Sequence, residues 1–346
     1  MTPLRVGIVG CGGISWTHGE ALAKLKHEGL AEIVAATDAL PERAEAFTKQ
    51  HGGTAEASLE ELLVRPDVDA VTICTPSGLH GQMAAQAARA GKHILSEKPL
   101  DVWIDAVDKA IAAAEAAGVV YGCIFQERFS PAALKVKRAI DAGAFGEIVL
   151  ACAETKWYCD QEYYDSGEWR GTWSLDAGVF SNQGIHCLDK VQWLAGPVVQ
   201  VLSAMLLPRY HRAIEGETLG VVTLRFANGA LGTLAMTTLS FEGFPERVDI
   251  LGTKGSAMLV GDEITHFQTM EPYEDGSASS APAETGEQNR ATDPLALSSE
   301  GHLGNIRDFV LAVREGRQPL VSARSARQAS VLLNMIYEKA KVGPYA

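Results

Sequence analysis

The sequence predicts an α/β protein with an N-terminal doubly wound parallel sheet, followed by an α+β domain with a large, mainly antiparallel sheet. Three observations predict it. Short apolar runs alternate with helical patterns over roughly the first 120 residues. A glycine-rich turn follows the first apolar run, and longer strand patterns joined by turns begin beyond Gly146. Since 346 residues exceed the usual size of one domain, we expect two domains, at 1–123 and 124–346, with the option that the terminal helices pack back on the first.

The first half alternates strand and helix patterns. Strands are expected at 4–9, 31–37, 68–74, 93–95 and 119–123, and helices at about 13–25, 41–50, 79–90 and 101–117. Strands separated by helices of this length pair in parallel through right-handed crossovers. The ligand crevice of such a sheet lies at the carboxyl ends of its strands, where the glycine turn, Asp38, Thr75-Pro76 and Glu97-Lys98-Pro99 all fall.

The first turn, Gly10-Cys11-Gly12-Gly13-Ile14-Ser15, indicates dinucleotide binding. Glycines let the backbone approach a pyrophosphate, and the following helix N-terminus favours its negative charge. Asp38 ends the second strand at about the offset of a ribose-binding acid. Ala39 and Leu40 follow it where a 2'-phosphate site would need a basic or hydroxyl group, so NAD is favoured, while Arg43 keeps NADP open.

The second half begins with an amphipathic helix expected at 130–141. Strands are then expected at 147–157, 198–207, 218–226, 230–240, 247–252 and 256–260, forming an antiparallel meander. A face of such a sheet is commonly covered by a second subunit, which predicts a homo-oligomer. Residues 275–294 are polar without periodicity and are expected to form an exposed loop, and helical spacing returns at 302–314 and 323–341.

Composition excludes several classes of protein. The formal net charge of -13 argues against nucleic acid or an anionic membrane as a partner. No apolar stretch is long enough for a membrane span, and the N-terminus carries no signal-peptide pattern, so a cytoplasmic location is expected. The six cysteines form no C-x-x-C pair, which predicts reduced thiols and no metal site. A small-molecule ligand is favoured.

Two segments carry residues suited to acid-base chemistry. Lys98 follows a strand that points at the nicotinamide end of the crevice, where it can donate to a substrate hydroxyl. If the chain is helical from Asn182 onward, then Asn182, His186 and Asp189 share one face, and His186 can accept a hydroxyl proton. Taken alone, Lys98 is also typical of a surface lysine, His186 of a buried core histidine, and Asn182 of a helix cap.

The whole arrangement resembles the Gfo/Idh/MocA family of NAD(P)-dependent sugar and inositol oxidoreductases, over essentially the full chain. The resemblance rests on the glycine turn, Thr75-Pro76 with His80, Glu97-Lys98-Pro99, Gln126, Trp169-Arg170 and the Gly-x-His-x-x-Asp string ending in Asp189. It implies a Rossmann domain whose cofactor contacts fall on the following positions: Gly10, Gly12, Gly13, Ile14, Asp38, Thr75, Pro76, His80, Glu97, Lys98 and Gln126.

The resemblance also implies catalytic roles for Lys98 and His186. The family's sugar-orienting acid falls on position 182, which is Asn here; a carboxamide can fix a hydroxyl but cannot balance an imidazolium, so Asp189 or Glu154 become candidate partners of His186. The tryptophans are expected to stack on the sugar ring. The substrate-binding set is therefore Asn182, Asp189, Trp169, Arg170 and Trp157.

The expected function is NAD-dependent oxidation of a ring secondary hydroxyl on a sugar, inositol or sugar derivative, with hydride transfer to nicotinamide. Within the same class, a nucleotide-sugar dehydrogenase is the alternative, with its diphosphate held by some of Lys156, Arg170, Arg209 and Arg212. An NADPH-dependent keto-sugar reductase, aldose-aldose oxidoreduction with a trapped cofactor, and an NAD-binding redox sensor are further alternatives. A dimer or tetramer is expected to form through the C-terminal sheet.

Overall fold

The structure is a computed structural model that describes residues 2–274 and 299–346, so the exposed loop expected at 275–294 lies outside the described residues. The chain forms two compact units, which are described separately below. The first contains Met1–Gln126 and Ser298–Ser330, and the second contains Glu127–Leu297 and Val331–Ala346. Within the described ranges, no helix has the length and apolar character needed to cross a membrane.

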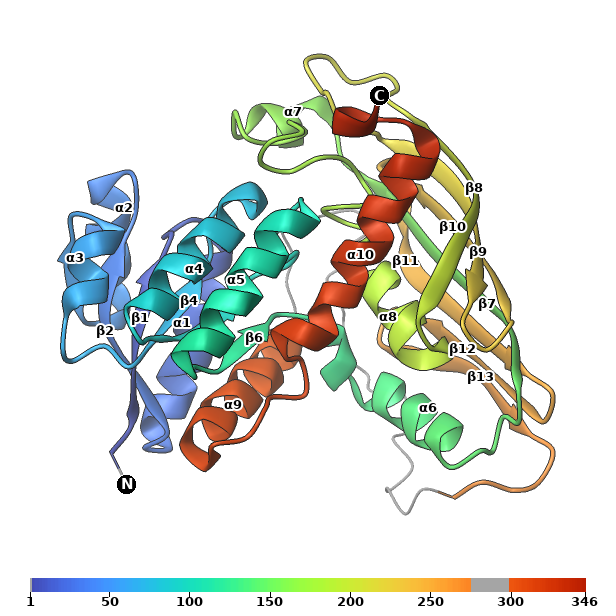
Figure 1. Ribbon diagram of the computed structural model, residues 1–346, viewed down its shortest axis with the longest axis horizontal. Helices are drawn as coiled ribbons and strands as arrows, with labels where there is room; N and C mark the ends of the chain where they lie inside the picture. Colours follow the sequence, from blue (N-terminus) through green and yellow to red (C-terminus); the bar gives the residue numbers. More distant parts are fainter. Residues whose placement is uncertain (1, 275–298) are drawn as a thin grey trace. The chain divides into compact units, whose positions relative to one another are not determined.

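The first unit is built on a six-stranded sheet in the order β3-β2-β1-β4-β5-β6, with every pair parallel (Figure 1). Its strands are β1 (Leu4–Val9), β2 (Ala31–Thr37), β3 (Thr54–Glu56), β4 (Ala70–Ile73), β5 (His93–Ser96) and β6 (Tyr121–Cys123). Its helices are α1 (Gly13–His27), α2 (Pro41–His51), α3 (Leu59–Val64), η1 (Ser77–Leu79), α4 (His80–Arg89), α5 (Ile104–Ala117) and α9 (Ser299–Glu315). Helix α10 (Ala323–Ala340) begins in this unit and ends in the second.

This order confirms the doubly wound fold, with the change of direction between β1 and β4. The apolar side of α1, formed by Ala21, Leu22 and Leu25, is buried in a core with β1. Helix α9 adds Ile306 and Phe309 to the same core. Strand β3 and helix α3 were not expected, because a three-residue strand and a helix of less than two turns leave too short a pattern to recognise.

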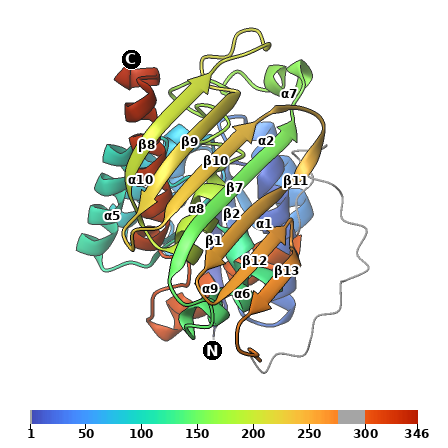
Figure 2. The ribbon, with the colours of Figure 1, turned by 90° about the vertical axis from the view of Figure 1, so that its right-hand side faces the viewer.

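The second unit is built on a seven-stranded sheet in the order β13-β12-β11-β7-β10-β9-β8 (Figure 2). Its strands are β7 (Ile148–Tyr158), β8 (Val198–Leu207), β9 (Leu219–Phe226), β10 (Leu231–Thr237), β11 (Leu239–Gly252), β12 (Gly255–Val260) and β13 (Glu263–Thr269). Its helices are η2 (Gln126–Phe129, whose first residue belongs to the first unit), α6 (Pro131–Asp141), α7 (Gln161–Asp165), α8 (Ile185–Ala195) and η3 (Gly343–Tyr345).

The sheet is mainly antiparallel, but the expected simple meander is wrong in its strand order, and the edge strand β13 was not expected. Strand β7, the first in sequence, lies between β10 and β11 and pairs with β10 in parallel. The expected strand at 230–240 is divided at Thr238, which belongs to neither β10 nor β11, although its N–H still donates to the carbonyl of Thr218 in register with the β9–β10 pairing. The chain then runs straight into β11, which reaches the other side of β7.

The two faces of this sheet differ in burial. Alternate residues of β9 and β10, such as Val222 and Leu234, are fully buried, and helix α8 packs on β7 and β11. The opposite side chains are exposed, including Met205 and Val221, which face each other across β8 and β9. One face therefore positions α8, and the other presents apolar side chains to solvent.

Candidate active site

The glycine turn of the first unit is shaped to receive an anion. Gly10 has φ +88°, and a side chain there would meet the backbone of Cys74 at 2.9 Å, so only glycine fits. A Cβ on Gly12 or Gly13 would meet nothing within 4 Å. Helix α1 has no side-chain cap and no acidic residue in its first turn, so its N-terminal amides are available to a pyrophosphate.

Ser15 occupies the third position of the turn, where a third glycine is usual. Its hydroxyl donates to the carbonyl of Gly12 at 2.6 Å, and the residue is fully buried. The serine therefore closes the turn with its own hydrogen bond. Ile14 lies in the first turn of α1 and is half-buried.

Asp38 lies directly after β2 and is tied to the glycine turn. One of its oxygens accepts the N–H of Cys11 at 2.6 Å, and the other accepts the N–H of Leu40 at 2.9 Å. Each carboxylate oxygen keeps a further lone pair, which suits a ribose diol. Arg43, the residue that kept NADP open, is exposed in α2.

The loops after β4 and β5 are joined by His80. Its Nδ1 lies 2.7 Å from the carbonyl oxygen of Pro99, and its Nε2 lies 2.8 Å from the carbonyl oxygen of Thr75. Both ring nitrogens are thus committed to backbone. His80 links the Thr75-Pro76 loop to the segment that carries Lys98.

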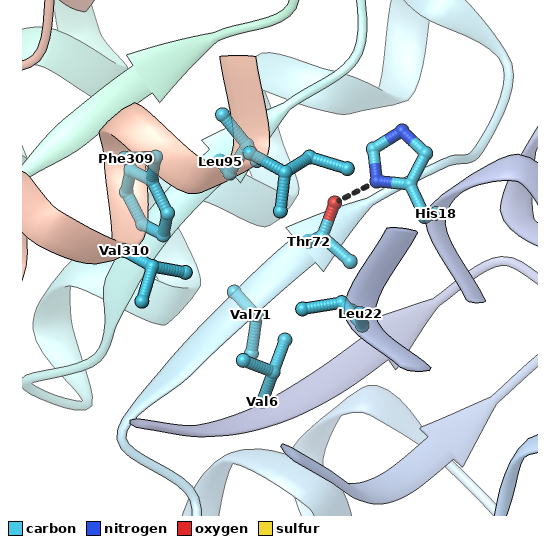
Figure 3. Close-up of a pocket in the computed structure, with 9 residues that line it drawn as sticks. Val6, His18, Leu22, Val71, Thr72, Leu95, Phe309 and Val310 are labelled. Atoms are coloured by element: carbon cyan, nitrogen blue, oxygen red, sulfur yellow. Dashed lines mark hydrogen bonds between the residues drawn. The ribbon is translucent and has the colours of Figure 1, made fainter. Parts of the chain in front are cut away.

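Glu97 is the centre of a buried cluster of side chains that the sequence analysis did not predict. Figure 3 shows one member of this cluster, His18, with its hydrogen bond to Thr72. His18 Nε2 lies 2.9 Å from a Glu97 oxygen and His302 Nε2 lies 3.5 Å from the same oxygen. Burial lowers the pKa of His18. Its Nε2 faces the Glu97 carboxylate, which can only accept, and its Nδ1 lies 2.9 Å from the Thr72 hydroxyl. These three residues, two imidazoles and a carboxylate, could also hold a divalent cation, since their ligand atoms lie within 4.8 Å of one another.

The charge of Glu97 steadies the backbone of the candidate catalytic lysine. Although burial alone would raise the pKa of Glu97, hydrogen bonds from His18 and His302 hold it well below its usual range. The second oxygen of this carboxylate accepts the N–H of Lys98 at 3.2 Å. Lys98 is half-buried at the carboxyl end of β5, on the rim where the fold expects a ligand.

The first unit fits a dinucleotide by two independent observations. The open space above Gly12 and Gly13 is the cradle that a side chain would fill. Gln126 is buried, and its Oε1 has no hydrogen-bond partner among the described residues, so it can accept from a bound group. Both features belong to the residues that the sequence had assigned to the cofactor.

In the second unit, Asn182 lies before helix α8 and not within it, so the assumption of a helix from residue 182 is wrong. Its backbone N–H donates to Gly178 in a tight turn, and α8 begins at Ile185. A side chain on Gly184 would meet the sulfur of Met236 at 2.2 Å, so the helix starts where the chain touches β10. His186 follows in the first turn of α8 and is 7% exposed.

Trp157 lies on the face of β7 that packs on the start of α8. Its neighbours on that face, Thr155 and Cys159, contact Cys187 and Gln183 respectively. Trp157 is 7% exposed, and its indole N–H has no hydrogen-bond partner among the described residues. It is therefore a buried donor on the strand face that packs on the start of α8, the helix that carries His186.

Trp169 and Arg170 form a stacked group with Tyr163. The guanidinium of Arg170 lies over the rings of Tyr163 and Trp169, at 4.2 Å and 4.5 Å from their centroids. It also donates to the hydroxyl of Tyr163, which accepts a second hydrogen bond from Gln183 at 3.0 Å. The segment at 169–170 is thereby connected to the turn before α8.

Asp189 and Glu154, the two acids considered as partners of His186, have other partners. Asp189 is buried and accepts from the guanidinium of Arg128, with Nε at 2.7 Å. Glu154 pairs with Lys156. An acid that the sequence analysis did not single out, Asp176, accepts from the side chain of Asn182 instead.

Comparison with known proteins identifies both units. The sequence model of the "Oxidoreductase family, NAD-binding Rossmann fold" (GFO_IDH_MocA) matches residues 4–125, and that of the "GFO/IDH/MocA C-terminal domain" matches residues 133–258. Fold class and resemblance are thus confirmed.

Relatives with solved structures or curated functions span nearly the whole chain. The WlbA dehydrogenase from Bordetella pertussis, solved with NADH and UDP-GlcNAcA, has a TM-score of 0.85 and 32% identity, covering 98% of this chain and 97% of that one. The dTDP-3,4-didehydro-2,6-dideoxy-α-D-glucose 3-reductase of Actinomadura kijaniata is 37% identical over 95% of this chain and 94% of its own. The myo-inositol 2-dehydrogenase of Thermotoga maritima is 25% identical over 95% and 94%.

The family matches cover most of the chain, and the glycine turn, Asp38 and Gln126 fit the nucleotide that the family binds. This protein therefore belongs to the Gfo/Idh/MocA family and is an oxidoreductase with an NAD-binding Rossmann domain.

Proposed function

We propose that the protein is an NAD-dependent dehydrogenase that oxidises a ring secondary hydroxyl of a sugar, an inositol or a sugar derivative. The observation that carries the proposal is the pair of candidate acid-base groups held in the two family-matched units. Lys98 lies two residues after the end of β5 in the NAD-binding unit, and His186 lies in the first turn of α8 in the C-terminal unit. When bound, NAD supplies the hydride acceptor.

The proposed roles follow from the chemistry of each group. A neutral imidazole accepts a hydroxyl proton near neutral pH, which suits His186. An ammonium donates to the substrate oxygen and stabilises charge on it as the proton leaves, which suits Lys98. The Glu97 cluster supports Lys98 by holding its backbone N–H, and His80 supports it through the carbonyl of Pro99.

The proposed substrate contacts are Trp157, Trp169, Arg170 and Asn182. The indoles suit the apolar face of a sugar ring, and the buried N–H of Trp157 suits a hydroxyl oxygen. Asp189 was assigned to this set from the sequence. Its buried pair with Arg128 supports an anchoring role for helix α8, and this difference between contact and anchor is open to test.

Nucleotide sugars are the second candidate substrates. The WlbA dehydrogenase was solved with UDP-GlcNAcA, and the 3-reductase is named for a dTDP-sugar; these relatives are 32% and 37% identical to this chain. The myo-inositol dehydrogenase is 25% identical, so the comparison supports a nucleotide sugar. Among the four basic residues considered for a diphosphate, Lys156 is paired with Glu154 and Arg170 is stacked on Tyr163, whereas Arg209 and Arg212 are exposed. Arg209 and Arg212 are therefore the proposed phosphate contacts.

The test is turnover with NAD and with NADP on three substrates: myo-inositol, a free hexose and UDP-GlcNAcA. Lys98→Met is expected to lower kcat by at least about 100-fold, the scale of acid-base catalysis, and to leave NAD affinity within about 2-fold. His186→Gln should have a similar effect. Exposed residues of the same units provide the controls, Lys109→Met and His266→Gln, which should retain wild-type activity.

The outcomes separate the alternatives. If none of the three alcohols is oxidised but NADPH is consumed in a parallel assay with a keto-sugar, the protein is the reductase. NAD binding without turnover on any substrate would favour the redox sensor and overturn the proposal, as would full activity of the Lys98→Met variant. NAD that stays bound through purification would indicate aldose-aldose oxidoreduction.

We also propose a homo-oligomer, a dimer or tetramer formed through the outer face of the second unit's sheet. Met205 and Val221 are 68% and 54% exposed and pair across two strands, and Val199 and Leu231 are exposed on the same sheet. Val221→Lys should lower the mass measured by sedimentation if this face is an interface. The predicted cytoplasmic location is kept as a proposal, supported by six free cysteines.

A further inference from the structure

Asp176 links the two substrate-side segments of the second unit. It is 2% exposed, and its carboxylate oxygens have different partners. Oδ2 accepts the backbone N–H of Gly171 at 2.8 Å, directly after Trp169-Arg170. Oδ1 accepts the side-chain Nδ2 of Asn182 at 2.7 Å.

The second of these hydrogen bonds fixes which way the Asn182 amide faces. A carboxamide has a donor end and an acceptor end of nearly the same shape, and its orientation is set by its partners. A carboxylate can only accept, so Nδ2 must face Asp176. Asn182, which is half-buried, therefore presents Oδ1 on its other side.

Several titratable groups surround Asp176. Cys159, Tyr163 and Glu217 each sense its charge, and the first two also sense that of Arg170. Burial, with a smaller contribution from Asp176, raises the pKa of Glu217 to about 7. A protonated Glu217 near neutral pH spares Asp176 a second buried negative charge close by.

We propose that Asp176 is a positioning residue: it orients the Asn182 amide so that a neutral carbonyl oxygen accepts a hydrogen bond from a substrate hydroxyl. This inference rests on the proposed function and specifies how the Asn in place of the family's Asp serves it. The negative charge is on Asp176, which contacts Asn182 and not the substrate. At position 182 the site thereby offers the substrate hydroxyl a neutral hydrogen-bond acceptor in place of a charged one.

The sharpest test exchanges the acid and the amide. In Asp176→Asn, the new amide still gives its oxygen to the Gly171 N–H, so its NH₂ faces position 182. Asn182 must then turn its oxygen toward residue 176 and present a donor to the substrate. We expect kcat/KM to fall by about 10- to 100-fold, mainly through KM, the scale of one mismatched polar contact.

Adding Asn182→Asp to that variant should restore activity to within about 5-fold of wild type, because a carboxylate accepts on both sides. Asn182→Asp alone places two carboxylates at hydrogen-bond distance, and they cannot both ionise. Its melting temperature relative to wild type should fall as pH rises from 5 to 8. The double variant should lose this pH dependence.

The melting measurement needs no substrate, so it separates this inference from the proposed function. An inactive wild type with the expected melting pattern would overturn the function and leave the acid-amide arrangement intact. If Asp176→Asn stays folded with unchanged kcat/KM, or if Asn182→Asp fails to rescue it, the positioning role is wrong. Equal melting profiles for Asn182→Asp and wild type at all pH values would also overturn it.

Discussion

The glycine turn of the first unit and the turn before α8 in the second both lead into a helix, but they are built differently. The turn before α1 leaves open space above Gly12 and Gly13, while the Asp38 carboxylate and the Ser15 hydroxyl hold its backbone from the side. The turn before α8 is filled by side chains, with the buried carboxyl groups of Asp176 and Glu217 accepting from Asn182 and Phe180. The pyrophosphate of a dinucleotide can be held by backbone N–H groups in an open turn, whereas the proposed substrate contact requires side chains with a fixed orientation.

If the second unit depends on buried charged side chains in this way, removing one of them should cause the largest loss of stability. Asp189→Asn leaves the guanidinium of Arg128, 3% exposed, without its carboxylate. The free energy of unfolding should fall by about 3–5 kcal/mol. Urea unfolding followed by circular dichroism measures it.

The control for that variant is Asp141→Asn, which removes the partner of Lys137 in a surface pair. It should change stability by no more than about 0.5 kcal/mol. An Asp189→Asn variant with wild-type stability and a raised KM would instead return Asp189 to the substrate contacts assigned from the sequence.

The next largest expected change in stability depends on pH and comes from Glu217. Burial raises the pKa of Glu217 to about 7 from 4.5, so the folded state holds this proton more tightly than the unfolded state. Its contribution to stability is therefore fullest below pH 4.5 and is lost as pH rises toward 7, by about 3 kcal/mol in total. Glu217→Gln can still accept from Phe180 and Tyr337, and it should remove that loss.

Melting curves of both proteins between pH 5 and pH 8 check this. The stability advantage of Glu217→Gln over wild type should grow with pH and level off above pH 7. Glu168→Gln, at an exposed carboxylate of the same unit, should run parallel to wild type throughout. A difference between Glu217→Gln and wild type that stays constant with pH would contradict the assignment.

Substitutions in the glycine turn should change stability less, and they distinguish a glycine needed for the backbone conformation from a glycine needed for cofactor binding. Gly10→Ala forces a side chain into φ +88° and against Cys74, so the cofactor-free protein should lose about 2 kcal/mol. Gly12→Ala meets nothing within 4 Å, so stability should hold while NAD affinity falls, because the methyl enters the anion cradle. Thermal unfolding and NADH fluorescence titration distinguish them; equal stability losses would contradict the cradle.

The same contrast explains how much the sequence could predict. The strands at 4–9 and 31–37 match residue for residue, and the glycine turn and Asp38 lie where expected, because these signals are local. Asp176 lies only six residues before Asn182, yet its role depends on a turn that no periodicity reveals. Arg128 meets Asp189 across 61 residues and Tyr337 meets Glu217 across 120, contacts that only the folded sheet creates.

The smallest predicted effect lies in the turn before α8, at Ala177, whose φ of +59° is costly for any residue with a Cβ. Ala177→Gly relieves that strain but removes a fully buried methyl group, so the two terms nearly cancel and stability should change by less than about 0.5 kcal/mol. Two controls separate the terms. Ala213→Gly, at φ +57° on the surface, should gain about 0.5–1 kcal/mol, and Ala153→Gly, buried in β7, should lose about 1 kcal/mol or more. A loss at Ala177 as large as at Ala153 would mean that the turn stores no strain, and that its shape is set by the carboxylates alone.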